Sequence, residues 1–246
     1  MKTVFIGDIH GRTTWKRIVR ENKDADQVVI FGDYFDPYNF VSFEMQKSNF
    51  LEIVEFARRG DYDVVLLLGN HDIHYFIDGV EPCSRFDKYN KSVIRDLFLE
   101  NIGIFDVVYA YDNVLCSHAG ISPAWLLNYE KKFNPENIDL YVHDLFVDEP
   151  TAFAYEDSDM SMIGNSVLQG PMWIRPSALI RANKQDQSIT KEFIQVFGHT
   201  QVEDIVEATK VLEEETSGRF YMVDALESKG YLVEENGVFT PINLEL

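Results

Sequence analysis

Five short motifs, spread over most of the chain, each combine a glycine with side chains that commonly bind metal ions. They are Gly7-Asp8-Ile9-His10-Gly11, Gly32-Asp33-Tyr34-Phe35-Asp36, Gly69-Asn70-His71-Asp72, Ser117-His118-Ala119-Gly120 and Gly198-His199-Thr200. Four of the six histidines fall inside them. Carboxylate, amide and imidazole groups are ligands for divalent ions that range from Mg and Mn to Fe and Zn. The motifs therefore indicate a metal site assembled from distant parts of the chain.

Three of the motifs follow short, apolar and largely β-branched runs, which predict strands. The runs are Thr3–Ile6, Gln27–Phe31 and Val64–Leu68, and segments with apolar residues at helical spacing separate them. Strands that alternate with helices form parallel sheets, and ligands bind such sheets at the carboxyl ends of the strands. We therefore expect the motifs to meet in one crevice.

Later runs predict further strands, which we expect to form a second sheet. Val107–Tyr111 and Val114–Ser117 flank a tight turn, Phe193–Phe197 leads into the last motif, and Asn236-Gly237 marks a hairpin in the tail. The predicted fold is α/β, with two mixed β-sheets packed face to face and flanking helices. This arrangement is a four-layer αββα sandwich.

The domain organisation is simple, because no linker or internal repeat interrupts the chain. We expect residues 1–246 to form a single domain with a less regular, substrate-determining segment around 121–192. Within that segment, Val147–Met160 carries several acidic residues around Pro150 and predicts an exposed acidic loop.

Charge and hydropathy exclude several classes of function. Lys and Arg number 22 against 41 Asp and Glu, which gives a net charge of −19 and a field that repels polyanions. No stretch approaches the length of a membrane span, and the apolar run before Asp8 is too short for a signal peptide. The two cysteines, Cys83 and Cys116, suggest no disulfide framework. We expect a cytoplasmic protein that binds neither nucleic acid nor membrane.

Taken in order, the motifs GDIHG, GDYFD, GNHD, SHAG and GHT resemble those of the calcineurin-like metallophosphoesterases. They are most similar to the branch that holds the serine/threonine phosphoprotein phosphatases and the symmetrical bis-nucleoside tetraphosphatases. Five motifs in order, from Gly7 to Thr200, are far more specific than any one of them. The resemblance implies a metal-dependent phosphoric ester hydrolase, or metallophosphatase, that acts on a phosphoprotein or a small phosphorylated molecule.

The resemblance also implies ligands for two divalent ions: Asp8 and His10 on the first ion, Asp33 between the two, and Asn70, His118 and His199 on the second. A carboxylate has two oxygens, so Asp33 can hold both cations. Where many branches have a further histidine on the first ion, this chain has Gln201. These ligands accept Mn, Fe, Zn and Mg, and of these we expect Mn.

In the family, the histidine that corresponds to His71 is catalytic rather than a ligand. It would protonate the leaving group or stabilise the transferring phosphoryl group, while hydroxide held between the ions attacks phosphorus. We expect Asp72 or Asp36 to hold the other ring nitrogen and raise its basicity. His74 and His143 lie outside the pattern and are expected to be ordinary surface or hydrogen-bonded core residues.

The chain departs from the phosphatases at the position of an arginine that grips the substrate phosphate, because Pro37 follows Asp36. A replacement is Arg175, in a Trp-x-Arg segment that resembles one of the same branch. A planar guanidinium can chelate two phosphate oxygens, so we expect a catalytic role for it. Arg12 is a second candidate, although a role as a surface cation at a helix start is equally compatible with the sequence.

Aromatic residues after the bridging carboxylate are candidates for the walls of the pocket. They are Tyr34, Phe35, Tyr38 and Phe40. Cys116, beside the fourth motif, is expected to be a small buried strand residue rather than a nucleophile.

Three functions are compatible with these residues. The first is a bimetal-dependent phosphoesterase that hydrolyses phosphomonoesters by attack of a metal-bridging hydroxide. The alternative is a hydrolase of bis-nucleoside polyphosphates, which are phosphoanhydrides. A lesser alternative is a non-catalytic interaction scaffold on the same fold, although the presence of both Asp33 and His71 argues against it. A nuclease is disfavoured by the acidic balance.

Overall fold

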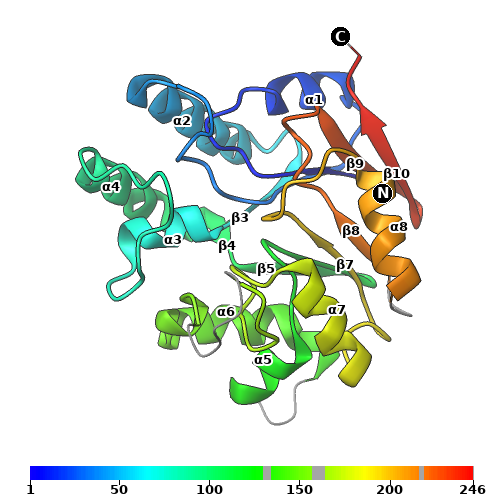
Figure 1. Ribbon diagram of the computed structural model, residues 1–246. Coiled ribbons are helices and arrows are strands. Elements are labelled where there is room, and N and C mark those ends of the chain that lie inside the picture. Colours follow the sequence, from blue (N-terminus) through cyan, green and yellow to red (C-terminus); the bar gives the residue numbers. More distant parts are fainter. Residues whose placement is uncertain (130–133, 157–163, 216–218, 246) are drawn as a thin grey trace.

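The computed structural model describes residues 1–129, 134–156, 164–215 and 219–245, and its strands form two mixed sheets (Figure 1). The first sheet has the order β10-β9-β1-β2-β3-β4 and the second the order β5-β6-β7-β8. The strands are β1 (Lys2–Ile6), β2 (Gln27–Ile30), β3 (Asp63–Leu67), β4 (Phe105–Asp106), β5 (Val108–Tyr111), β6 (Val114–Ser117), β7 (Ile194–Phe197), β8 (Phe220–Met222), β9 (Gly230–Glu235) and β10 (Val238–Asn243).

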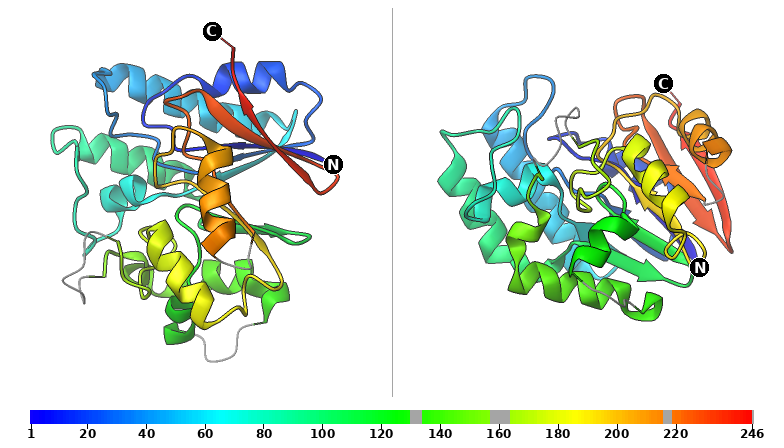
Figure 2. Two further views of the ribbon diagram at one scale, coloured as in Figure 1. Left: turned by 45° about the vertical axis from the view of Figure 1, so that its right-hand side comes forward. Right: turned by 60° about the horizontal axis from the view of Figure 1, so that its bottom comes forward.

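The helices lie outside the two sheets (Figure 2). They are α1 (Trp15–Glu21), α2 (Phe43–Arg59), α3 (Asn70–Phe76), α4 (Lys91–Asn101), α5 (Pro123–Tyr129), α6 (Ile138–Asp148), α7 (Pro176–Gln185) and α8 (Ile205–Glu215). α2 stops at Gly60, whose φ of 73° is the left-handed conformation that ends many helices.

Alternation of side chains along the strands explains the layers. On β1, Val4 and Ile6 join the cluster that holds Trp15 of α1 and Phe50 of α2. Phe5, between them, joins the separate cluster that lies between the two sheets. Successive strand residues point to opposite faces, so the stretch Val4–Ile6 of β1 is continuously apolar because both of its faces are covered. The predicted αββα arrangement is confirmed.

The register of the parallel strands aligns their carboxyl ends. β1, β2 and β3 are parallel, with Ile6 opposite Ile30 and Ile30 opposite Leu66. In the second sheet β6 and β7 are also parallel, with Ser117 opposite Phe197. Each of these strands is followed by one of the sequence motifs, so the motifs gather at the carboxyl edges of both sheets.

The structure corrects the expected position of the tail hairpin. Both of its strands were predicted in the second sheet, but β9 pairs antiparallel with β1 in the first, with Phe5 opposite Leu232. Without β9, the apolar β1 would be an edge strand with unpaired backbone groups. The turn at Asn236-Gly237 is confirmed, since both residues have positive φ.

The segment 121–192 is more regular than we predicted, since α5, α6 and α7 lie in it. α7 begins at Pro176, a residue that is favourable at the first helical position and that we did not use as a signal. The expected acidic loop is wrong at its start, because α6 runs to Asp148 and a 3-10 turn covers Pro150–Phe153. Residues 157–160 of that expected loop lie outside the described residues.

None of the helices in the described part of the chain combines the length and the apolar character that crossing a lipid bilayer requires.

We predict that Phe50→Ala destabilises the protein by about 3–5 kcal/mol, because Phe50 is fully buried among aromatic rings. The matched control is Phe40→Ala, since Phe40 is 97% exposed and its loss should change the free energy of unfolding by no more than about 0.5 kcal/mol. Urea unfolding in the presence of a chelator measures both. Equal effects of the two substitutions would contradict the packing described above.

Candidate active site

The loops that follow the strands bring six distant side chains together. Those of the first sheet contribute Asp8 and His10 after β1, Asp33 after β2 and Asn70 after β3, and those of the second contribute His118 after β6 and His199 after β7. All six are at least nine-tenths buried. The backbone N–H of His199 donates to both carboxylate oxygens of Asp8 at 3.1 Å, although 191 residues separate them. The predicted convergence is therefore observed.

Two of the histidines turn a nitrogen without a proton toward the same carboxylate. His10 Nδ1 lies 3.0 Å from the carbonyl oxygens of Phe35 and Asp36, and His118 Nδ1 lies 2.6 Å from that of Phe31. Carbonyl oxygens only accept, so each Nδ1 carries the ring proton. Burial lowers the pKa of both rings, that of His118 to about 3, so both rings are neutral.

The two bare nitrogens face negative charge. His10 Nε2 lies 3.4 Å from Asp33 Oδ2, and His118 Nε2 lies 3.6 Å from the same oxygen. Lone pairs that meet at such distances repel one another unless a cation lies among them. A histidine that donates its other N–H to a backbone carbonyl is also the usual arrangement of a metal ligand. This donor set fits a divalent ion.

A second group of ligand atoms gathers around Asn70. Its Oδ1 lies 2.9 Å from His118 Nε2 and 3.0 Å from His199 Nδ1. Ligand atoms of Asp8, Asp33 and His118 all lie within 4.8 Å of one another. The implied set for the two ions is thus compact, and Asp33 lies between its two halves.

The backbone of the site is conformationally demanding. His10, Asp33, Asp36 and His199 all have φ between 41° and 61°, a region that side chains other than glycine rarely adopt. Strain of this kind is commonly stored at functional sites. At Gly69 a Cβ atom would collide with the carboxylate of Asp33, which explains why the third motif begins with glycine.

Burial of several acids together perturbs their ionisation. Burial, with the charges of Asp224 and Asp33, raises the pKa of Asp8 well above its usual value. Burial, with the charge of Asp72, does the same for Asp33. Carboxylates that are buried side by side ionise readily only when positive charge neutralises them.

Behind His71 lies a second carboxylate, Asp36. His71 Nδ1 lies 2.9 Å from Asp36 Oδ2, His74 Nε2 lies 3.1 Å from the same oxygen, and the hydroxyl of Tyr75 donates to Oδ1. Burial alone would raise the pKa of Asp36, but these three hydrogen bonds lower it. Asp36 is therefore an ionised acceptor that fixes the ring of His71.

Asp72, which we predicted in a catalytic role, lies elsewhere. Its carboxylate accepts from the backbone N–H groups of Asp33, Tyr34 and Gly69 at 2.8–2.9 Å. It joins the loops after β2 and β3 and does not contact the ring of His71. Of the two carboxylates that we considered for that contact, Asp36 is the one that the structure supports.

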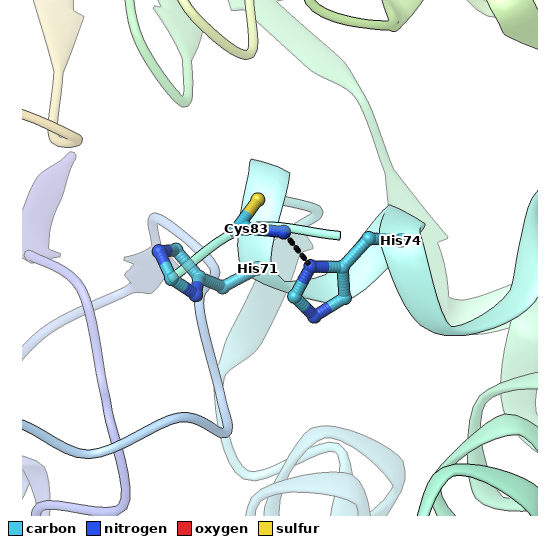
Figure 3. Close-up of side chains that lie close together, drawn as sticks. All are labelled: His71, His74 and Cys83. Carbon is cyan, nitrogen blue, oxygen red and sulfur yellow. Dashed lines mark hydrogen bonds between the residues drawn. The ribbon is translucent and has the colours of Figure 1, made fainter. Parts of the chain in front are cut away.

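His71, His74 and Cys83 form a compact group beside the site (Figure 3). The backbone N–H of Cys83 donates to His74 Nδ1 at 3.0 Å. Since the other nitrogen of His74 faces Asp36, both of its ring nitrogens are engaged within the protein. We interpret His74 as a positioning residue in the core, in agreement with its expected structural role; His143 is exposed, as expected.

A cavity of about 390 Å³ opens beside these residues. Arg175, which we predicted as a phosphate grip, lines it and donates to the Thr200 hydroxyl at 3.0 Å. Of the expected aromatic walls only Tyr38 lines this cavity. Tyr34 and Phe35 are buried in the core, and Phe40 is exposed outside the cavity. Cys116 is buried in β6, as predicted.

The two arginine candidates differ. Arg12 pairs with Glu227 at 3.0 Å, so its charge is already neutralised. Arg85, which we did not predict, lines the cavity, and its guanidinium carbon lies 3.9 Å from the centroid of the Tyr38 ring. Among the described residues, neither Arg85 nor Arg175 forms a salt bridge. Both charges are available to an anion.

Asp224 is a further residue that we missed in the sequence. It is 1% exposed, and it lies two positions after β8, at the same edge as the motifs. The apolar run Phe220–Val223 is typical of a strand, so an acidic residue directly after it was a usable signal. Arg85 had no comparable signal, because it lies in an irregular loop between α3 and α4.

Comparison with known proteins gives one family. Residues 1–203 match the model of the family described as calcineurin-like phosphoesterase. Among curated proteins, the chain is 25% identical over 176 residues to a symmetrical bis(5'-nucleosyl)-tetraphosphatase of Baumannia cicadellinicola, over 63% of this chain and 58% of the relative. It is 31% identical over 145 residues to one of Buchnera aphidicola, over 53% of this chain and 48% of the relative. The chain thus spans about half the length of these relatives.

Solved structures agree on the fold. A cold-active protein-tyrosine phosphatase of Shewanella sp. aligns with a TM-score of 0.61 over 98% of this chain and 77% of its own, at 18% sequence identity. At that identity the likeness concerns the fold alone.

We predict that metal affinity rises with pH. Because burial raises the pKa of Asp8 and Asp33, the metal-free protein holds protons on these carboxyls to a higher pH than exposed carboxyls do. A cation must displace them, so uptake of Mn²⁺ should release protons, and its Kd should fall between about pH 5 and about pH 8. His118 is neutral throughout this range, so its ionisation should not contribute to the pH dependence of the Kd.

Calorimetric titration in two buffers of different ionisation enthalpy measures both the Kd and the protons released. A Kd that is independent of pH, with no proton release, would contradict the description of these carboxyls.

Proposed function

This chain belongs to the calcineurin-like phosphoesterase family, and we propose that it is a bimetal-dependent phosphoesterase that hydrolyses phosphomonoesters. The observation that carries the proposal is the convergence of two bare imidazole nitrogens on the buried carboxylate of Asp33. Membership of the family implies divalent metal ions and a phosphorylated substrate.

We propose the following ligands: Asp8, His10 and Asp33 on the first ion, and Asp33, Asn70, His118 and His199 on the second. When bound, two divalent ions would polarise the substrate phosphate and lower the pKa of an attacking water molecule. Oxygen-rich ligands suit Mn²⁺, which we propose as the natural ion. The fixed loops of the protein position these groups before substrate arrives, which supports electrostatic catalysis without rearrangement.

His71 is the proposed general acid. Its Nδ1 is held by Asp36, so Nε2 is the nitrogen that is left to face the substrate. The carboxylate of Asp36 behind the ring fixes its orientation, so that Nε2 can give a proton to the leaving alkoxide. His71 also lines the cavity, in reach of a bound substrate.

Arg175 and Arg85 are the proposed phosphate-binding groups. Their guanidinium groups line the cavity without an acidic partner among the residues described, and they can neutralise a phosphate that the net charge of −19 would otherwise repel. The cavity volume is near the lower end of the range for ligand pockets. That size favours a phosphate on a compact body, such as an amino-acid side chain.

A second candidate is hydrolysis of bis-nucleoside polyphosphates. The curated relatives described above are named for that reaction, and two arginines could hold more than one phosphate group. We rank it second because the chain spans only about half of those relatives.

We expect His71→Asn to lower kcat on phosphomonoesters by about 10²–10⁴-fold while leaving the bound metal unchanged, because it removes the proton donor only. The matched control is His143→Asn at an exposed site, which should leave kcat unchanged. Steady-state kinetics and metal analysis on the same preparations make the comparison. A His71 variant with the wild-type rate would rule out the proposed acid.

A substrate panel with Mn²⁺ tests the reaction itself. We expect kcat/KM to be higher for aryl phosphates and phosphopeptides than for dinucleoside tetraphosphates, because the small cavity favours a phosphate on a compact body. The reverse order would select the second candidate. If the protein bound two ions and yet turned over neither class, it would be a scaffold.

A further inference from the structure

Asp224 occupies the same relative position as residues of the proposed metal centre. β7 and β8 are parallel, with Phe197 opposite Met222. His199 lies two positions after β7 and Asp224 two positions after β8, so the two residues emerge at the same edge of the second sheet. The backbone around Asp224 also packs against Gly7, since a Cβ on that glycine would collide with Asp224 Cα. Gly7 directly precedes Asp8.

Among the described residues, no N–H or hydroxyl group donates to the buried carboxylate of Asp224. Its residue is 1% exposed, and the side chain in hydrogen-bond reach of it is another acid, Asp8, so the two can bond only by sharing a proton. Burial of an ionised carboxylate without compensation is strongly unfavourable, and nearly all buried polar groups have a partner. The carboxylate of Asp224 therefore lies beside Asp8, a proposed ligand of the first ion.

No Lys or Arg in the described part of the chain forms a salt bridge with this carboxylate. Arg12 is close enough to act on its charge, but the Arg12 guanidinium forms its ion pair with Glu227 instead. Arg175 donates to Thr200. Asp8, the closest acid, carries the same charge as Asp224 and adds repulsion. The buried carboxylates of Asp8 and Asp224 therefore both require positive charge to remain ionised.

We propose that Asp224 is a fourth protein ligand of the first metal ion, with Asp8, His10 and Asp33. The proposal rests on the metal centre of the proposed function. It accounts for both unpartnered oxygens, and it supplies a ligand on the ion for which Gln201 offers no histidine.

The fourth ligand makes the two sites chemically different. The first ion has three carboxylates and one imidazole, a set that suits hard ions such as Mn²⁺ and Mg²⁺. The second has one shared carboxylate, one amide and two imidazoles, a set that accepts softer ions such as Zn²⁺. Asp224 therefore favours a hard ion at the first site.

Titration of the chelator-treated full chain with Mn²⁺ tests this ligand. For Asp224→Asn, an almost isosteric change, we expect the Kd of one site to rise by about 100-fold or more and that of the other to stay unchanged. The matched control is Asp24→Asn, which makes the same change at an exposed acid outside the centre and should leave both constants unchanged.

Crystals of the wild-type protein grown with Mn²⁺ give a second measurement that does not depend on the variant folding. We expect an Asp224 oxygen about 2.0–2.6 Å from the first ion. Wild-type protein with two ions and Asp224 out of bonding range, or an Asp224→Asn variant with unchanged constants, would overturn this inference alone. Wild-type protein that binds no ion would instead overturn the metal centre itself.

Discussion

Uncompensated negative charge and lone pairs in the interior are the constraint on which this structure depends. His10 and His118 must be neutral and must carry their protons on Nδ1, because carbonyl oxygens face those nitrogens. Their other nitrogens then face Asp33, a buried acid without a cationic side chain beside it. Such a cluster needs protons or cations to compensate its charge, and that need supports the metal centre that we propose.

The fold provides the cluster by aligning strand ends. Two parallel sets of strands, one in each sheet, stop at the same level, so every loop that follows them starts near the others. Asp72 ties together the loops after β2 and β3 through backbone N–H groups, and the positive φ of His10, Asp33 and His199 turns their side chains inward. The surrounding hydrogen bonds hold a strained backbone that local preference would relax.

The sequence predicted the sandwich and the convergence of the motifs because both follow from local signals, namely apolar runs that stop at a glycine beside polar residues. The six side chains themselves were named by the resemblance of the motifs to those of a known family. The sequence did not predict the sheet that the tail hairpin joins, since the pairing of β9 with β1 depends on β1 otherwise being an edge. Nor did it decide between Asp36 and Asp72 behind His71, which is a matter of loop geometry. Arg85 reaches the cavity from an irregular loop, where no periodic pattern places a side chain.

The count of divalent ions on each chain is the most direct test of the central claim that buried charge in this cluster requires metal. After loading with Mn²⁺ and dialysis, elemental analysis of the wild-type protein should give two ions per chain. Asp33→Asn removes the shared carboxylate and should retain at most one, while Asp24→Asn, at an exposed acid, should retain two. A wild-type protein that takes up none, or an Asp33 variant that keeps both, would contradict the account.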